Sequence, residues 1–322
     1  MRALRPLLAL VFLICSPLQA LAQDYPSKPV RIIVPAPAGS PIDVLARIIG
    51  QKLTEMSGQQ FIVDNRPGAT GTTGTTAAVK ATPDGYTLLM SSTSNYISAY
   101  YFNANVSYNP GKDLEAIILV AKLPAYLLAN PKFPAKSISE LIALSRQNPD
   151  KHTFASMGHG SGPHLIFEMF MKANGIRLLH IPYKGQAPAL NGLVAGQVDV
   201  AFDNVLTSHS LVKAGLLKAL AVTGTERVAV TPDVATMAES GMRGFELYFW
   251  FGLLAPTGTP SFVIEKLNGE IGRIMSTPEM QERLAQLGGN HTPNSPHQFR
   301  DFLASDTARW VKLIEDTGAR LD

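Results

Sequence analysis

The stretch that decides the fold is residues 30–43, which read VRIIVPAPAGSPID. Its first five residues, Val30–Val34, form a short β-branched run that is typical of a buried strand. Ser40 can cap a following helix, Pro41 suits the first helical position, and Asp43 can reach back as in a capping box. The stretch therefore predicts a strand, a short loop and a helix.

The same rhythm continues downstream. Residues 61–63 and 86–90 read as further strands. Residues 68–76 are only Gly, Ala and Thr, which predicts a loop whose backbone can come close to another group because its side chains are small. A helix is expected to follow over residues 77–81. Alternating strands and helices predict a parallel sheet with helices on its faces.

Two longer apolar stretches, residues 116–129 and 245–255, enclose a segment with its own alternation of elements. That segment opens with a capping box at residues 137–140. Its remaining elements are expected as strands at 153–155, 179–181, 198–202 and 220–222, and helices at 164–172 and 187–195.

We therefore expect one α/β unit inserted in another. Domain 1 would comprise residues 23–123 and 250–322, and domain 2 residues 124–249. Three Pro-containing helix starts after Pro256, at residues 259–260, 277–278 and 295–298, predict helices that pack back on domain 1.

The amino terminus has the layout of a secretory signal peptide. Arg2 and Arg5 are the only charges before Asp24, residues 7–15 are apolar, and a small-x-small triplet ends at Ala22. We expect residues 1–22 to be a signal peptide cleaved after Ala22, with export to the periplasm. A buried N-terminal helix is the alternative.

Cys15 is the single cysteine of the chain, and Ile14 stands before it where a lipid-anchor motif would have a small residue. We therefore assign Cys15 to the discarded leader. The mature chain would have 300 residues and a net charge of +1, which supports neither nucleic-acid binding nor a polybasic membrane surface. Without disulfides, such a chain needs an extensive core. We expect a monomer.

Patterns for catalysis are incomplete. Residues 158–162 read GHGSG, but His159 occupies the position where a hydrolase elbow around Ser161 would have glycine. Residues 68–74 lack the Lys-Ser/Thr of a phosphate loop, and no dinucleotide fingerprint follows the first strand. Five of the seven histidines fall between residues 152 and 209, with no spacing of a known zinc motif. We expect no cofactor and no metal. Asp43, Glu168 and Asp203 could act as acids or bases, but each also has a structural role available.

Binding has better support. Four polar or glycine-containing segments, residues 37–40, 91–95, 158–161 and 183–185, lie where predicted strands end and helices begin. Unpaired N–H groups and the dipole at a helix start attract anions. Each loop alone could be an ordinary capped turn; together they predict an anion-binding cleft between two domains.

Six dispersed segments then define a resemblance: residues 25–29 with 32–35, 64–69, 83–89, 182–185 with 187–189, 196–200, and 250–256. The chain resembles the Bug-type solute-binding proteins of tripartite tricarboxylate transporters. The resemblance implies a two-domain α/β periplasmic-binding-protein fold of type II (Venus flytrap), with a ligand cleft between the domains. It also implies capture of a small organic anion (a di- or tricarboxylate, an aromatic acid or an acidic amino acid) for membrane subunits of such a transporter, and no enzymatic activity.

Carried over to this sequence, the resemblance implies that the ligand contacts residues from five loops. They are Pro37, Ala38, Gly39 and Ser40; Ser92, Thr93 and Asn95; Gly158, His159, Gly160 and Ser161; Tyr183, Lys184 and Gly185; and Asp203 and Asn204.

The chain departs from the family pattern at three places. Ser40 replaces a second glycine and could contact the ligand or only cap a helix. His159 could meet the ligand or narrow the cleft, and Asn95 also differs from the common pattern. Asp203 and Asn204 could hold an ammonium group or cap a turn. A periplasmic sensor subunit and, less favoured, a periplasmic hydrolase remain alternative functions.

Overall fold

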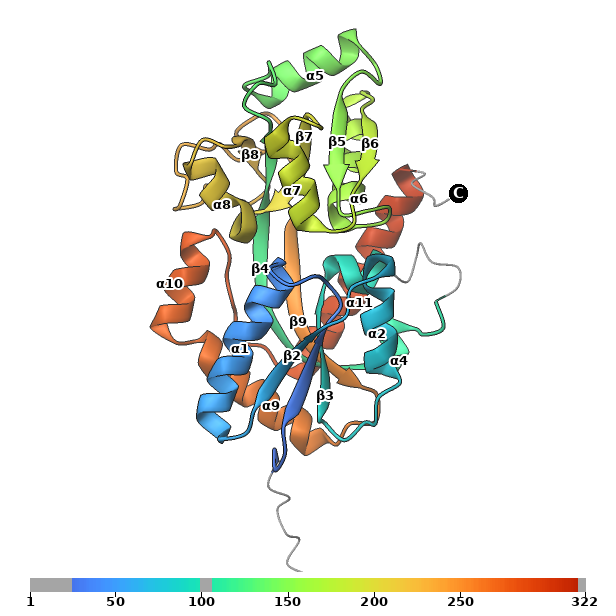
Figure 1. The fold of residues 1–322 in the computed structure, drawn as a ribbon, viewed down its shortest axis with the longest axis vertical. Helices are drawn as coiled ribbons and strands as arrows, with labels where there is room; N and C mark the ends of the chain where they lie inside the picture. Colours follow the sequence, from blue (N-terminus) through green and yellow to red (C-terminus); the bar gives the residue numbers. More distant parts are fainter. Residues whose placement is uncertain (1–24, 99–105, 318–322) are drawn as a thin grey trace, which may run out of the picture.

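The computed structural model describes residues 25–98 and 106–317. The strands are hydrogen-bonded in the order β2-β1-β3-β9-β4-β7-β5-β6, with β8 paired to β4. Figure 1 shows two groups of elements, one around β1–β3 and one around β5–β8, joined by the long strands β4 and β9. We call these groups the first and second lobe. The predicted signal peptide and its cleavage site lie outside the described residues.

The first lobe is built on parallel strands. β1 (Val30–Val34) lies between β2 (Phe61–Asn65) and β3 (Thr87–Ser92), and β3 pairs antiparallel with β9 (Tyr248–Pro256). The helix predicted after β1 is α1 (Pro41–Ser57), whose apolar face buries Leu45, Ile49 and Leu53, as the helical spacing requires. The opening stretch of sequence is therefore confirmed as strand, loop and helix.

The boundary predicted for the next helix is wrong. The helix α2 covers Thr72–Val79 rather than residues 77–81, and a single 3-10 turn, η1 (Ala69–Gly71), precedes it. A Cβ at Gly74, inside α2, would lie 2.8 Å from Arg66 O and from Pro35 Cα. The close backbone approach expected of this glycine-rich segment is present, but it is made by a helix instead of a loop.

The second lobe repeats the architecture. β5 (Thr153–Ser156) pairs parallel with β6 (Leu179–Pro182) and β7 (Val200–Asn204). The described helices of this lobe are α5 (Ile138–Gln147), α6 (Gly162–Asn174), α7 (Gln186–Ala195) and α8 (Val205–Lys213). The sequence predicted α5, α6 and α7 but not α8.

Helices near the carboxyl end complete the core. α9 (Ser261–Met275) packs on α1 and β4, α10 (Pro278–Gln286) packs on α9, and the short α4 (Pro110–Asp113) precedes β4. α11 (Pro296–Thr317) contacts β4 and also α6, so the last helix touches both lobes and not the first alone. Within the described ranges, no helix is both long enough and apolar enough to span a bilayer.

One strand, β4 (Leu114–Ala129), runs through both lobes. Its residues up to Pro124 pair with β9, whereas Ala125 onward pairs with β7 and with β8 (Lys218–Val222). The chain thus crosses from the first lobe to the second between Pro124 and Ala125. It crosses back between Leu247 and Tyr248, where Leu247 N donates to Thr223 O and Tyr248 begins to pair with Pro124. The sheet partners therefore change close to the expected domain limits at 123/124 and 249/250. The limits themselves stay a prediction.

The hydroxyl of Thr223 connects the two crossings. It accepts a hydrogen bond from Ala125 N at 2.9 Å and donates to Leu247 O at 2.6 Å, and the residue is fully buried. We expect Thr223→Val, which keeps the shape, to lower the free energy of unfolding by about 1–3 kcal/mol because two buried backbone groups lose their partner. Urea titration measures this change.

Thr225→Val is the matched control. The Thr225 hydroxyl bonds to Tyr248 Oη at 3.0 Å on the exposed side of the same crossing, where water can replace it. We expect Thr225→Val to change the free energy of unfolding by no more than about 0.5 kcal/mol. Equal effects of the two substitutions would contradict the role assigned to Thr223.

Candidate functional site

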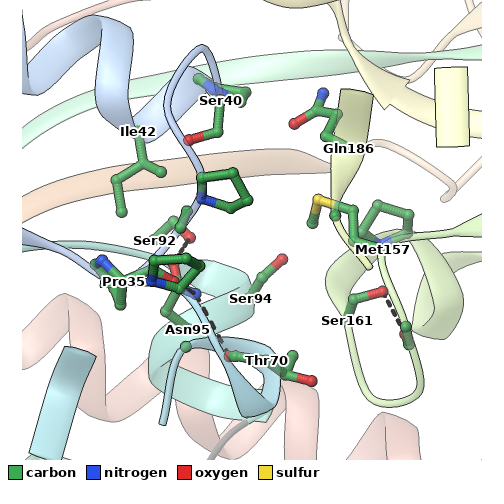
Figure 2. A pocket seen from close by; sticks show the side chains of 18 of the residues that line it. Pro35, Ser40, Ile42, Thr70, Ser92, Ser94, Asn95, Met157, Ser161 and Gln186 are labelled. Atoms are coloured by element: carbon green, nitrogen blue, oxygen red, sulfur yellow. Dashed lines mark hydrogen bonds between the residues drawn. The ribbon is translucent and has the colours of Figure 1, made fainter. Parts of the chain in front are cut away.

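A cavity of about 610 Å³ lies between the lobes, a volume typical of small-molecule sites. It is lined by residues at the carboxyl ends of strands in both lobes, where parallel α/β sheets bind ligands. Figure 2 shows Ser40, Ser94 and Thr70 of the first lobe facing Met157, Ser161 and Gln186 of the second across this interlobe cavity.

Eleven of the sixteen residues expected at the ligand line the interlobe cavity. They are Pro37, Ser40, Ser92, Asn95, Gly158, Ser161, Tyr183, Lys184, Gly185, Asp203 and Asn204. Five do not: Ala38, Gly39, Thr93, His159 and Gly160. Among the described lining residues, Lys184 and Asp203 are the ionisable ones of opposite charge, and no arginine contributes.

The five misplaced residues have other partners or face elsewhere. Ala38 and Gly39 are exposed, and Gly39 N donates to the Asp43 carboxylate at 2.8 Å. The Thr93 hydroxyl accepts from Trp250 N at 3.0 Å inside the sheet. Gly160 N donates to His164 Nδ1 at 3.2 Å, and the exposed His159 packs its ring on other histidines. The Gly39 amide is therefore already paired within its own loop.

Asp43 is structural. Besides Gly39 N, it accepts hydrogen bonds from Arg47 Nε at 3.0 Å and from Asn65 Nδ2 at 2.9 Å. Burial opposes ionisation of this carboxyl group, but the hydrogen bonds from Arg47, Gly39 and Asn65 outweigh it and lower its pKa. Asp43 thus fixes the loop after β1 and is not available as an acid or base.

Five helices direct their amino termini toward the interlobe cavity. Their N-cap residues all line it: Ser40 for α1, Gly71 for α2, Ser161 for α6, Gly185 for α7 and Asn204 for α8. Four of these caps lack a side-chain hydrogen bond to their own helix, and Asn204 alone provides one. First-turn amides therefore remain without intrahelical partners around one space.

Two buried polar atoms of the lining have no hydrogen-bond partner, the hydroxyl of Ser40 and Nδ2 of Asn204. Ser40 is the N-cap residue of α1 by position, but its side chain makes no hydrogen bond to the helix. Asn204 accepts from Leu206 N at 2.9 Å through Oδ1, so its cap role is present and its amide group is still able to donate. Buried polar groups are normally paired, so both atoms retain unused hydrogen-bonding capacity.

Asp203 lies in the wall of the cavity beside Gln186 and Thr207. Gln186 Nε2 donates to one carboxylate oxygen, and the Thr207 hydroxyl donates to the other at 3.0 Å. Burial raises the pKa of Asp203 to about 7, even though hydrogen bonds from Thr207, Ser208 and Gln186 act in the opposite direction. The group is therefore partly protonated at neutral pH.

The lobes touch directly along the cavity. Gly162 N donates to Ser94 Oγ at 3.0 Å, and the Thr70 hydroxyl donates to His159 O at 3.3 Å. At Gly185, whose φ is +120°, a Cβ would lie 3.3 Å from Pro37 Cγ. The arrangement is that of lobes closed on one another.

Several lining residues were missed by the sequence analysis. They include Thr70 and Gly71 in the glycine-rich segment, Ser94, Met157, Gln186, and Phe249 and Phe251 on β9. The Gly, Ala and Thr composition of residues 68–76 was a usable signal for close contact. Phe249 and Phe251 belong to an apolar stretch that resembles any buried strand, so nothing in the sequence marks them.

Comparison with known proteins decides the family. The model of the "Tripartite tricarboxylate transporter family receptor" matches residues 45–319. The chain belongs to this receptor family. It is 36% identical over 301 residues to the protein BugT of Bordetella pertussis, covering 93% of this chain and 92% of that one.

Solved structures agree with this assignment. An R. palustris protein determined with adipate superposes with a TM-score of 0.89 at 31% identity, covering 92% of this chain and 100% of that one. MatC from Rhodopseudomonas palustris, determined with bound malate, superposes with a TM-score of 0.84 at 30% identity, covering 90% and 100%. The fold is thus the two-domain α/β fold of periplasmic binding proteins.

The receptor family binds solutes and does not convert them, so this chain is a binding protein and not an enzyme. The geometry at the candidate hydrolase motif agrees. The Ser161 hydroxyl donates its proton to Gly158 O at 2.7 Å, and His164 Nδ1 accepts from the Gly160 amide. The serine of the motif therefore lacks the paired imidazole that an activated nucleophile needs.

The raised pKa of Asp203 predicts a pH effect on the stability of the receptor. The folded state holds the proton up to about pH 7, whereas the unfolded state releases it near pH 4. The stabilisation is complete below about pH 4 and is lost as the pH rises toward 7, at about 1.4 kcal/mol per pH unit. We expect Asp203→Asn to remove this dependence, so the variant gains stability over the wild type at pH 8 relative to pH 5.

Urea unfolding of both proteins at pH 5 and pH 8 measures the difference. Asp233→Asn, at an exposed aspartate, serves as the control and should follow the wild type at both pH values. Parallel pH profiles for the wild type and Asp203→Asn would contradict the assignment.

Proposed function

We propose that this receptor captures a small carboxylate-bearing metabolite in the periplasm and delivers it to the membrane subunits of a tripartite tricarboxylate-type transporter. The observation that carries the proposal is the convergence of five helix amino termini on one cavity. Each helix presents the equivalent of about half a positive charge there. The related structures determined with adipate and with malate support a carboxylate as the ligand.

Main-chain and neutral side-chain donors would do most of the binding. On α1, Pro41 has no N–H, which leaves the amides of Ile42 and Asp43 in the first turn; on α7, the amides of Gln186 and Ala187 have the same position. These donors are held in place by the helices, so they lose little entropy on binding. Lys184 is exposed at the rim and would act by attracting the anion.

The magnitudes suffice for a useful affinity. A hydrogen bond to a charged group contributes about 1.5–3 kcal/mol, so four of them supply roughly 6–12 kcal/mol. A micromolar dissociation constant corresponds to about 8 kcal/mol. The cavity has room for roughly twenty water molecules, which leaves space for a small metabolite and bridging water.

Closure would complete the site. The lobes would move about the two crossings near Pro124 and Leu247, where the sheet changes partners. Ligand would favour the closed state because the first-lobe helices α1 and α2 and the second-lobe helices α6–α8 reach it together only when the lobes meet.

The function is tested by calorimetry of the mature chain, residues 23–322, with adipate, malate, aspartate and nicotinate as probes. We expect saturable binding of one molecule of at least one probe. Asn204→Asp retains an oxygen to cap α8 but replaces the unpartnered Nδ2 donor with a negative charge. We expect it to weaken that binding at least about 100-fold.

Asn109→Asp is the control, because Asn109 is likewise an N-cap, accepting from Gly111 N at 3.0 Å, and lies outside the interlobe cavity. It should bind the probe as the wild type does. The proposal is wrong if none of the four carboxylates binds, or if Asn204→Asp binds as tightly as the wild type.

Closure is tested separately at Ser94. When the lobes meet, its hydroxyl accepts from the Gly162 amide, which water can satisfy when they part. We expect Ser94→Ala to cost the closed state about 1 kcal/mol and to weaken binding of the best probe about fivefold, mainly through faster release. Stopped-flow kinetics measure the release rate.

Ser91→Ala is the matched control. Ser91 lies on β3 three residues before Ser94, its Oγ is buried without a hydrogen-bond partner among the described residues, and it does not line the cavity. Unchanged release from Ser94→Ala, or equally faster release from both variants, would contradict this part of the account.

A further inference from the structure

Three histidines from separate parts of the second lobe come together next to the interlobe cavity. We call His159, His164 and His180 the three-histidine cluster. They belong to the loop after β5, to the first turn of α6 and to β6, elements that lie together in Figure 1. One ring nitrogen from each lies within 4.8 Å of the other two.

The rings form a compact group. His164 and His180 are stacked with centroids 4.3 Å apart, and His159 meets His180 edge-on at 4.8 Å. Two rings are half-buried and one is exposed, so the cluster has one open side. Phe154 stacks on His180 at 4.7 Å and closes the apolar side.

His180 has a nitrogen available for coordination. Its Nε2 lies 2.7 Å from Ser156 Oγ, and that hydroxyl donates its own proton to Gly158 O. In the tautomer in which the hydroxyl donates to Gly158 O, the imidazole donates to Ser156 Oγ, and Nδ1 carries the free lone pair. Nδ1 is buried and has no hydrogen-bond partner in the part of the chain that the structure describes. A buried polar atom without a partner is uncommon, and this nitrogen is free to accept a ligand bond.

His164 has the surroundings of a metal-binding imidazole. Its Nδ1 accepts from Gly160 N at 3.2 Å, so the proton is on Nε2, which lies 3.5 Å from Glu168 Oε1. A carboxylate next to the protonated Nε2 fixes the tautomer of the imidazole and makes Nδ1 more basic. The Gly160 amide must turn away to free Nδ1, and Gly158 and Gly160 on this loop both have positive φ values.

Both half-buried rings are neutral at neutral pH. Burial, and then the nearby His159, lower the pKa of His164 to about 4; burial, with His164 and His159, lowers that of His180 to about 3. Metal ions bind the neutral imidazole, so no proton has to leave these two rings.

The sequence predicted no metal; from the arrangement of the rings, we propose instead that His159, His164 and His180 bind one divalent transition-metal ion of the Zn²⁺ class. Three imidazole nitrogens without thiolates suit Zn²⁺, Co²⁺, Ni²⁺ or Cu²⁺ and not Mg²⁺ or Ca²⁺. Water would take the remaining position on the exposed side.

The spacing and the orientation of the rings both require adjustment, because the stacked His164 and His180 rings must tilt before their in-plane lone pairs meet at one ion. Metal–nitrogen bonds of about 2.0–2.1 Å place tetrahedral ligand atoms about 3.3 Å apart. The cluster must therefore contract by up to about 1.5 Å from its present spacing. The exposed His159 ring can rotate to do so, because no hydrogen bond holds it among the described residues.

The site lies outside the interlobe cavity but shares a loop with it. Gly158 and Ser161 line the cavity, and His159 O accepts the Thr70 hydroxyl of the first lobe. A metal bound to the three-histidine cluster would restrain this loop on the side that faces away from the cavity. Metal binding and carboxylate binding are therefore distinct events that can be measured separately.

The test uses the mature chain without a histidine tag, stripped with a chelator. We expect calorimetry with ZnCl₂ to give one site with a dissociation constant below about 10 µM. We expect CoCl₂ to give the visible absorption of a four-coordinate nitrogen site. His159→Ala should weaken both at least about tenfold, and its exposed position leaves the core intact.

His297→Ala is the matched control. His297 is exposed on α11, 3.0 Å from Asp301, and lies outside the three-histidine cluster. It should bind Zn²⁺ as the wild type does. Long-range ¹H–¹⁵N spectra of the wild type should show that Zn²⁺ shifts the ring nitrogens of all three cluster histidines, which requires no variant of the buried rings.

The proposal is overturned if the wild type binds no stoichiometric Zn²⁺ up to about 100 µM. It is equally overturned if His159→Ala and His297→Ala bind alike. In either case the three rings are only an extension of the aromatic stack around Phe154. Carboxylate binding has no part in these readouts, so their failure leaves the proposed function unaffected.

Discussion

The exchange of sheet partners within the single strand β4 is the constraint on which the rest of the structure depends. Up to Pro124 the strand completes the sheet of the first lobe, and from Ala125 it completes that of the second. Both lobes are therefore built on one continuous strand, and the Thr223 hydroxyl hydrogen-bonds to both of the segments that connect them. This connection brings the carboxyl ends of both sets of parallel strands to the same space.

The consequence is electrostatic. In an α/β lobe the helices start where the parallel strands end, so two lobes that face one another bring their helix amino termini together. The cavity thus gains positive potential without an arginine among its described lining residues. Asp203 is the buried carboxyl group among these lining residues, and burial raises its pKa because it disfavours the charged form. Neutral donors can then distinguish carboxylates by shape as well as by charge.

The sequence predicted what local chemistry determines and missed what depends on distant contacts. Capping residues and proline at helix starts located α1, α5 and α10 because those signals act within one turn. The start of α2 was wrong because the Gly- and Thr-rich composition of residues 68–76 indicates a close approach, here of Gly74 to Pro35, but does not show that a helix makes it. Gln186 was missed for the same reason, since its partner Asp203 is remote in sequence, and the histidines at 159, 164 and 180 have no recognisable spacing.

A crystal structure of the mature receptor, purified from the periplasm with whatever solute it retains, tests the central claim most directly. The account predicts an organic anion between the lobes, with carboxylate oxygens about 3 Å from first-turn amides of helices in both lobes. It also predicts Asn204 Nδ2 donating to that ligand. Carboxylates held only by Lys184 at the rim, or a cavity filled by the protein's own side chains, would contradict it.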